Sequence, residues 1–143
     1  MSIRISPYLN FAGSAREAMS FYREVFGGEL TIDTFGDYDM AENPEDRDKV
    51  MHSQLQVSPE LSIMASDAPP GMPLDTGAQV SVAVFDDDPA ETERLGRMFE
   101  ALSTDGGQVT VPFEKAPWGD VFGMCVDRFG ISWLFDGAAR NDG

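Results

Sequence analysis

Basic residues, histidine and cysteine are scarce in this sequence. Its 143 residues include ten lysine or arginine side chains against 25 aspartate or glutamate side chains, with one histidine and one cysteine. A single cysteine excludes an intramolecular disulfide, and Cys125 lies within an apolar strand-like run, where a thiol is usually inert. The formal net charge of −15 repels phosphate groups, so we expect neither nucleic acid nor an anionic membrane surface as a partner.

Long apolar runs and targeting signals are also missing. No apolar run approaches the roughly 20 residues that a transmembrane helix needs, and no basic region followed by an apolar stretch marks a signal peptide. The sequence contains no phosphate-cradling glycine loop, no nucleophile elbow and no zinc-type cysteine–histidine pattern. These absences favour a cytoplasmic protein, and a hydrophobic content of 42% is enough for a packed core.

The first half of the chain begins with a strand and a helix. Apolar and polar residues alternate over residues 3–11, as in a strand with one buried face. Ser14 and Glu17 have the spacing of a capping box at a helix start, and Gly27 is typical of a helix end. Three further strand-like runs follow, at residues 29–35, 49–57 and 61–66.

The same order of elements recurs in the second half. Residues 79–85 form a strand-like run, Asp88 and Glu91 repeat the capping spacing with Pro89 between them, and Gly106 ends the helix. Three strand-like runs follow again, at residues 108–113, 121–126 and 131–135.

This repeated βαβββ order predicts an α+β fold. We expect two tandem modules, residues 1–68 and 78–143, joined by a proline- and glycine-rich linker at residues 69–77. In each module the helix covers one face of the sheet. The two uncovered faces are then free to form a cupped mixed sheet around a cavity, with the helices on the outer face. A cavity of this kind is typical of a small-molecule site.

The polar faces of the strands supply candidates for lining that cavity. Eight side chains are predicted to bind the ligand: Tyr8, Asn10, His52, Gln54, Trp118, Asp120, Phe122 and Trp133. His52 could act as a general base, a metal ligand or a binding donor, or simply be a hydrogen-bonded strand residue. Trp118 and Asp120 flank a glycine at a strand entrance, which fits either a ligand contact or a turn that buries the tryptophan.

The sequence offers few partners for a metal at His52. The strand-like runs 61–66, 79–85 and 131–135 contain no aspartate, glutamate or histidine, so a second ligand has no predictable position. The acidic segment at 37–48 lacks the spacing of a calcium loop and favours a solvated loop. We therefore expect neither a metal nor another cofactor.

Several short segments together resemble one superfamily. They are Pro7–Phe11, Phe21-Tyr22 with Val25–Gly28, Val50–His52, Met64–Asp67, Trp118–Asp120 and Asp127–Trp133. With these segments the chain resembles the vicinal oxygen chelate superfamily, which includes glyoxalase I, extradiol dioxygenases and bleomycin or fosfomycin resistance proteins. Within it the chain is most similar to the PhnB-like branch, often described as a 3-demethylubiquinone methyltransferase.

The resemblance implies paired βαβββ modules, a homodimer, and a metal held by histidine or glutamate on the first, fourth, fifth and eighth strands. At those positions this chain has side chains that are poor metal ligands, and His52 lies on the third strand instead. The four positions fall near Ser6, Met64, Val80 and Leu134. Methyltransferase activity is not expected, because no glycine-rich nucleotide-binding strand–loop–helix is present.

The leading hypothesis is a dimeric, metal-free protein that binds a small molecule. Two alternatives stay open. A metal-dependent lyase, isomerase or dioxygenase could hold its metal with His52 and carboxylates from loops or from the partner subunit. An acidic dimer could also sequester a cationic antibiotic, which the net charge of −15 would attract.

Overall fold

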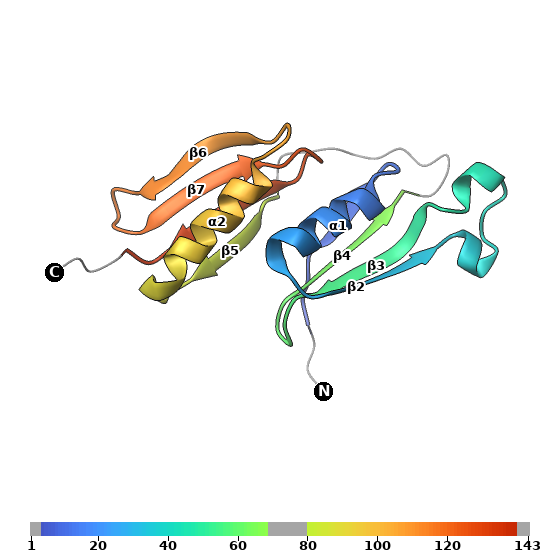
Figure 1. Ribbon diagram of the computed structural model, residues 1–143, viewed down its shortest axis with the longest axis horizontal. Helices are drawn as coiled ribbons and strands as arrows, with labels where there is room; N and C mark the ends of the chain where they lie inside the picture. The colour runs from blue at the N-terminus through green and yellow to red at the C-terminus, as the bar shows by residue number, and fades with distance from the viewer. Residues whose placement is uncertain (1–3, 69–79, 140–143) are drawn as a thin grey trace. The chain divides into compact units, whose positions relative to one another are not determined.

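The computed structural model describes residues 4–68 and 80–139. It divides the chain into two compact units, Met1–Thr76 and Gly77–Gly143, each built from one sheet and one long helix (Figure 1). The predicted linker at residues 69–77 lies outside the described residues, so the module boundaries stay a prediction. Within the described ranges, no helix is long and apolar enough to cross a membrane.

The first unit has the predicted βαβββ order. Its sheet runs β1-β4-β3-β2, with β1 parallel to β4 and the other neighbours antiparallel. The elements are β1 (Tyr8–Phe11), α1 (Ala15–Phe26), β2 (Glu29–Thr34), the 3-10 turns η1 (Gly36–Tyr38) and η2 (Pro44–Asp46), β3 (Val50–Gln56) and β4 (Ser62–Asp67).

The second unit repeats this topology. Its sheet runs β5-β8-β7-β6, and again the first strand of the unit pairs in parallel with the last. The elements are β5 (Val82–Asp86), the 3-10 turn η3 (Pro89–Glu91), α2 (Thr92–Leu102), β6 (Gln108–Lys115), β7 (Val121–Val126) and β8 (Ser132–Gly137). The predicted α+β fold of two tandem βαβββ modules is therefore confirmed.

The first strand is shorter than its alternating sequence predicts. The predicted run began at residue 3, but β1 begins at Tyr8, and Ile5 is fully exposed. Pro7 has no backbone N–H to donate, although its carbonyl oxygen accepts a hydrogen bond from the Met64 N–H at 3.0 Å. Pairing with β4 therefore starts at the proline, and Leu9 is the first residue of the strand to be buried.

The predicted capping box at the start of α1 does not form. Ser14 is the N-cap residue, but its side chain makes no capping hydrogen bond. The N–H groups of Gly13 and Ala15 donate instead to Asp67 Oδ1, at 2.8 and 3.0 Å. The second oxygen of Asp67 accepts from the Val50 N–H at 2.9 Å. One buried carboxylate thus joins the start of α1, the start of β3 and the end of β4.

The second predicted capping box is also only partly correct. Asp88 accepts a hydrogen bond from the Ala90 N–H at 3.0 Å, but this caps the 3-10 turn η3 rather than the α-helix. The α-helix itself begins at Thr92 with no side-chain hydrogen bond from Glu91 at its N-cap. A proline at the first position of η3 fixes a turn before the regular helix can start.

The second unit joins its helix to its last strand without a carboxylate. β4 and β8 show the same alternation of burial, and each ends on a buried residue. Gly137 at the end of β8 is therefore the counterpart of Asp67 at the end of β4. The Thr92 hydroxyl, at the start of α2, donates to the Ala138 carbonyl at 2.7 Å. A Cβ atom at position 137 would lie 3.0 Å from the Thr92 side chain, which would have to shift by a few tenths of an ångström to admit it.

Each helix lies against one face of its own sheet (Figure 1), and its buried residues form an apolar stripe. In the first unit Ala15, Ala18, Met19 and Tyr22 are fully buried. In the second unit the buried helix side chains are Leu95, Phe99 and Leu102, and they share the core with Trp133, Phe135 and Cys125. Burial of apolar area on this scale is the main stabilising contribution to each unit. It also leaves the opposite face of each sheet, which we term the open face, uncovered by the unit's own helix.

A β-bulge sets which residues of β3 reach the open face. Asp33 pairs with His52, but the next residue of β2, Thr34, pairs with Val50, which leaves Met51 as an extra residue. The bulge brings Val50 into the core, where it is fully buried, while strict alternation would have placed Met51 there. His52 remains on the open face.

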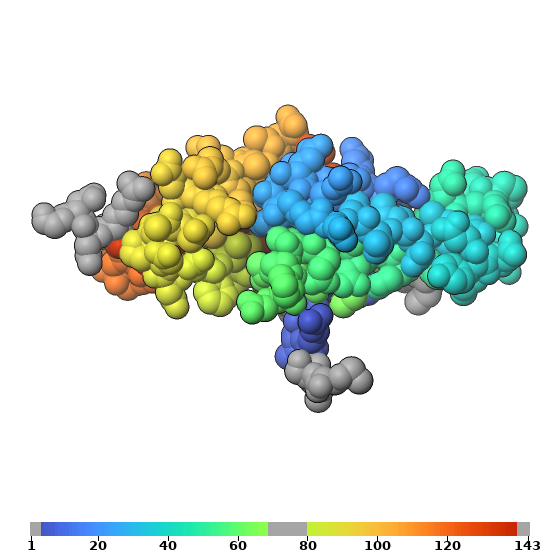
Figure 2. Space-filling model, turned by 60° about the horizontal axis from the view of Figure 1, so that its bottom comes forward, coloured from blue at the N-terminus to red at the C-terminus, as the bar shows by residue number. Residues whose placement is uncertain are grey.

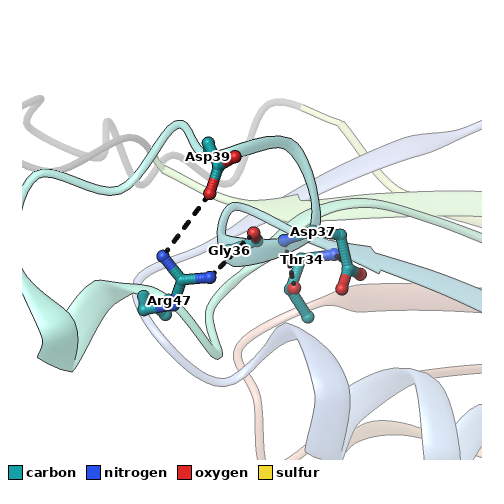
Figure 3. Close-up of polar contacts among 5 residues, drawn as sticks. All are labelled: Thr34, Gly36, Asp37, Asp39 and Arg47. Atoms are coloured by element: carbon teal, nitrogen blue, oxygen red, sulfur yellow. Dashed lines mark hydrogen bonds and ion pairs between the residues drawn. The ribbon is translucent and has the colours of Figure 1, made fainter.

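The acidic segment between β2 and β3 is organised by its own hydrogen bonds and lies at the right-hand end in Figure 2. The Thr34 N–H donates to Asp37 Oδ2 at 2.9 Å, and the Asp37 N–H donates to Thr34 Oγ1 at 3.2 Å. Arg47 donates to the Gly36 carbonyl at 3.1 Å and lies 3.8 Å from the Asp39 carboxylate (Figure 3). The hydrogen bonds from Thr34 hold the pKa of Asp37 below its usual value.

Candidate functional site

The open face of the first sheet carries half of the predicted ligand-binding residues: Tyr8, Asn10, His52 and Gln54. Cross-strand partners share a face, and the register places Tyr8 beside Met64 and Gln54 beside both Met64 and Thr31. Their neighbours along each strand alternate into the helix-side core. The open face of this sheet therefore presents Tyr8, Asn10, Thr31, Asp33, His52, Gln54, Gln56, Ser62, Met64 and Ser66.

Tyr8 and His52 are in direct contact on this face. The Tyr8 hydroxyl lies 3.4 Å from His52 Nδ1, and the two rings stack with centroids 5.9 Å apart at an interplanar angle of 26°. Tyr8 sits on the edge strand β1 and keeps 44% of its surface exposed, so its ring remains accessible to a ligand. The contact combines a flat apolar surface with groups that can donate, accept or pass a proton.

A chain of side-chain amides continues along β3 from this pair. Gln54 Nε2 donates to Gln56 Oε1 at 2.8 Å, and Gln56 Nε2 donates to the Ser58 carbonyl at 2.5 Å. Gln54 follows His52 by two residues, so the two side chains lie about 7 Å apart along the strand. The open face thus places a fixed amide one step from the aromatic pair.

Asp33 is a further polar residue of this face that the sequence did not single out. It is the cross-strand partner of His52 and is half-buried. The signal in the sequence was the alternation within residues 29–35, but the pairing of Asp33 with His52 depends on the register between β2 and β3, which the alternation alone does not give.

The open face of the second sheet is mainly apolar. Register places Phe85 and Phe122 on either side of Asp136, and Met124 beside Leu134. Outside the strands, Trp118 packs edge-to-face on Phe122, with ring centroids 5.3 Å apart at 71°. The turn before β7 therefore does not bury Trp118, which is 63% exposed.

Two carboxyl groups meet on this second open face. Burial raises the pKa of Asp136, and a hydrogen bond with Asp120 together with the charges of Asp120 and Asp87 raises it further. A carboxyl group with a raised pKa can keep its proton, and donate a hydrogen bond, at a pH where an isolated aspartate is ionised. The sequence pointed to Asp120, but it missed Asp136 because the predicted final strand stopped at residue 135.

Trp133 does not belong to either open face. It is the cross-strand partner of Cys125 on the helix side of the second sheet, and only 1% of its surface is exposed. Its indole N–H donates to Asp127 Oδ2 at 2.8 Å, while the other oxygen of that carboxylate accepts from the backbone N–H groups of Phe129 and Ile131. Trp133 is thus a core residue that stabilises the turn before β8, and it is too buried to contact a ligand on an open face.

Three strands extend beyond the predicted runs 61–66, 79–85 and 131–135, and each of these extensions includes an aspartate. β4 ends at Asp67, β5 ends at Asp86 and β8 includes Asp136. Asp67 points to the helix side and is occupied by three backbone N–H groups. Across residues 4–68 and 80–139, no group of three or more histidine, cysteine, aspartate or glutamate side chains is arranged to hold a metal.

Cys125 takes no part in either open face. It is 1% exposed and lies on the helix side of β7. Burial raises the pKa of its thiol, which leaves the sulfur protonated and a poor nucleophile near neutral pH.

Comparison with known proteins places the chain among close relatives. A family model described as 3-demethylubiquinone-9 3-methyltransferase matches residues 3–135. Protein YjdN of Escherichia coli (strain K12) is 28% identical over 145 residues, which cover 92% of this chain and 93% of that protein. The crystal structure of protein PA1353 from Pseudomonas aeruginosa is 39% identical with a TM-score of 0.80, covering 97% of this chain and 100% of that one.

More distant structures share the fold alone. A putative 3-demethylubiquinone-9 3-methyltransferase, PhnB protein, from Bacillus cereus is 22% identical with a TM-score of 0.71, covering 95% of this chain and 100% of that one. Structures described as glyoxalase-related or as glyoxalase/bleomycin resistance protein/dioxygenase family enzymes match at 17% and 12% identity, with TM-scores of 0.57 and 0.59.

Proposed function

We propose that this chain, which belongs to the family described as 3-demethylubiquinone-9 3-methyltransferase, binds a small organic molecule on the open face of its first sheet. The family is the PhnB-like branch with the glyoxalase-type fold. The proposed binding uses no metal. The observation that carries the proposal is the stacked pair of Tyr8 and His52. A ring surface of this kind binds flat apolar groups, and the adjacent polar atoms orient them.

The residues at the metal positions of the superfamily support the metal-free part of the proposal. The Ser6 hydroxyl donates to the Ser62 carbonyl at 2.8 Å and is therefore already engaged. Met64 offers a thioether, and Val80 and Leu134 offer no ligand atom in their side chains. A borderline or hard divalent cation needs nitrogen, thiolate or oxygen ligands that these positions do not supply.

Metal content separates this proposal from a metal-dependent lyase, isomerase or dioxygenase. Elemental mass spectrometry of the natively purified, dialysed protein is expected to give well below one divalent metal per chain, before and after titration with zinc, nickel, manganese and iron. Near-stoichiometric metal would overturn the metal-free proposal and make lyase and dioxygenase assays the next step.

Ligand binding is tested by thermal shift with a library of flat aromatic metabolites. A ligand at 100 times its Kd adds about 2.7 kcal/mol to the free energy of unfolding, which raises Tm by several degrees. Tyr8→Ala is expected to abolish the shift for ligands of the first open face. Arg23→Ala, on the exposed side of α1, is the matched control and should leave it intact. A library without a single Tyr8-dependent ligand would contradict the proposal.

A second candidate function, capture of a cationic ligand, is favoured by the second open face. Asp120 and Asp136 lie beside Phe122 and Trp118, and carboxylates next to aromatic rings attract organic cations. Binding of a cationic glycopeptide antibiotic that weakens as salt is raised would support this function, since exposed charges are screened by salt. Binding that ignores salt would exclude it.

The homodimer and the cytoplasmic setting belong to the same proposal. Sedimentation equilibrium is expected to give twice the 15.6 kDa mass of the chain. A monomer at the concentration where the ligand binds would show that the first open face works without a partner subunit.

A further inference from the structure

We propose that Gln54 makes the first open face selective for ligands that donate a hydrogen bond, because its side-chain Oε1 is fixed as an acceptor. This inference rests on the proposed small-molecule function of that face and names the ligand class: a flat aromatic molecule that carries an N–H or O–H donor.

The orientation of Gln56 is set by backbone carbonyl groups. Its amide nitrogen lies 2.5 Å from the Ser58 carbonyl oxygen and 3.4 Å from the Leu61 carbonyl oxygen. A carbonyl oxygen can only accept a hydrogen bond, so the reversed amide would turn the Gln56 oxygen toward two other oxygens. The nitrogen must therefore face the β3–β4 turn, and the Gln56 oxygen faces Gln54.

The orientation of Gln54 follows from that of Gln56. Gln54 Nε2 donates to Gln56 Oε1 at 2.8 Å, and the reversed amide would place the two oxygens against each other. The loss of a partly buried hydrogen bond opposes that reversal. The side-chain nitrogen of Gln54 therefore donates to Gln56, and Gln54 Oε1 is the atom available to accept a hydrogen bond from a ligand.

The cross-strand neighbours of Gln54 do not satisfy that oxygen. Thr31, its partner on β2, directs its hydroxyl at the Gln54 backbone carbonyl at 3.5 Å. Met64, its partner on β4, has no donor in its side chain. Among the hydrogen bonds of residues 4–68 and 80–139, Gln54 Oε1 accepts none. A half-buried acceptor without a donor is costly to cover with an apolar group.

The spacing across the sheet sets the size of the ligand. Tyr8 and Gln54 both flank Met64, so they are two strands apart, or roughly 10 Å. A ligand that stacks on the Tyr8 ring and lies over Met64 would bring a donor on its far side to Gln54. One or two fused aromatic rings span that distance.

The test compares indole with benzofuran, which have the same shape but differ in one atom, N–H against oxygen. Two-dimensional amide NMR titrations of the full chain give a Kd for each. Indole is expected to bind about fivefold to tenfold more tightly, the effect of one hydrogen bond to a partly buried group. In Gln54→Leu the two Kd values should become equal through weaker binding of indole. Gln54→Glu keeps an acceptor and should keep the preference for indole.

Two further variants control the result. Gln56→Leu frees the Gln54 amide to turn, so the preference for indole should fall although Gln54 is unchanged. Gln108→Leu replaces an exposed glutamine of β6 and should leave both Kd values unaltered. The same NMR spectra report whether each variant is folded.

The outcomes separate this inference from the proposed function beneath it. Equal Kd values for indole and benzofuran, both weakened by Tyr8→Ala, would leave the aromatic site standing and overturn the role of Gln54. A preference for indole that survives Gln54→Leu would also overturn it. Failure of both probes to shift any amide signal of β1 or β3 would remove the site and the inference together.

Discussion

Asp67 is the residue whose substitution is expected to affect stability most. Its carboxylate is 2% exposed and accepts hydrogen bonds from the N–H groups of Gly13, Ala15 and Val50. Asp67→Ala would leave three backbone donors without an acceptor, at about 1 kcal/mol or more each. We expect the free energy of unfolding to fall by about 3 kcal/mol or more, measured by urea denaturation. Ser66→Ala, its half-buried neighbour on the open face, should cost far less, and equal losses in the two variants would contradict this account.

Asp136 is expected to lower the free energy of unfolding as pH rises, whereas a carboxylate in an ion pair raises it. Its pKa is raised in the folded protein by burial and by Asp120, so the folded state holds a proton that the unfolded chain releases. The stabilisation by that proton is full below the unfolded pKa, near 3.8, and is lost as pH rises through the higher folded value.

Asp136→Asn tests this expectation. At neutral pH the variant should be more stable than the wild type by roughly 0.5 kcal/mol, the size of a partly exposed charge interaction. The difference should shrink as pH falls below the folded pKa, because both proteins then carry an uncharged group at this position. Chemical denaturation at several pH values measures it. A difference that stays constant down to pH 3 would rule out titration of Asp136 as the cause.

At the scale of elements, the turn from α1 into β2 depends on two adjacent glycines in different ways. Gly27 has φ of +77° with open space around a Cβ, whereas Gly28 has φ of +104° and a Cβ there would lie 2.8 Å from the Val57 Cα atom. Gly27→Ala is expected to cost about 1–2 kcal/mol from backbone strain alone. Gly28→Ala adds a collision with the end of β3, so its cost should be at least twice as large, as measured by thermal denaturation. Equal costs would mean that the backbone of β3 moves aside freely.

The sequence predicted the kinds of element and their faces better than their ends. Alternation placed Tyr8, Asn10, His52 and Gln54 together, because polar residues with a period of two share one face of a strand. Ser14 is the N-cap residue of α1 as predicted, but its side chain makes no capping hydrogen bond. At the second helix, the 3-10 turn that begins at Pro89 delays the start of α2 to Thr92. The N–H groups on either side of Ser14, those of Gly13 and Ala15, bind Asp67, which lies 53 positions after Ser14.

Parts of the candidate site depended on contacts that have no local signal. Asp33 faces His52 because of the register between β2 and β3, and the sequence of the long segment between these strands does not fix that register. Trp133 was predicted to bind the ligand as a residue of the final strand. Its indole N–H bond to Asp127 is what makes it a core residue, and only the folded chain brings those two groups together.

At the scale of the whole molecule, net charge is expected to set the response to salt. The chain carries 25 acidic and 10 basic side chains. Within residues 4–68 and 80–139, most ion pairs, such as Arg97–Glu93, are exposed and contribute little. Self-repulsion of this kind destabilises the compact state. Raising NaCl from about 0.01 to 0.5 M shortens the screening length from about 30 Å to a few ångströms.

Tm should therefore rise by several degrees over that range, as measured by differential scanning calorimetry. KCl should give the same rise as NaCl if screening is the cause, which separates it from binding of a particular ion. A flat or falling Tm would show that local ion pairs outweigh the net repulsion.

The two helix–strand junctions also bear on how the halves of this protein can evolve. Asp67 holds the first junction through three N–H groups, and the second depends on Gly137 beside Thr92. Copying aspartate to position 137 would press a side chain into Thr92, and copying glycine to position 67 would strip the first helix of its acceptor. Exchanging these two residues between the halves would therefore disturb both junctions, so the halves are not interchangeable at this position.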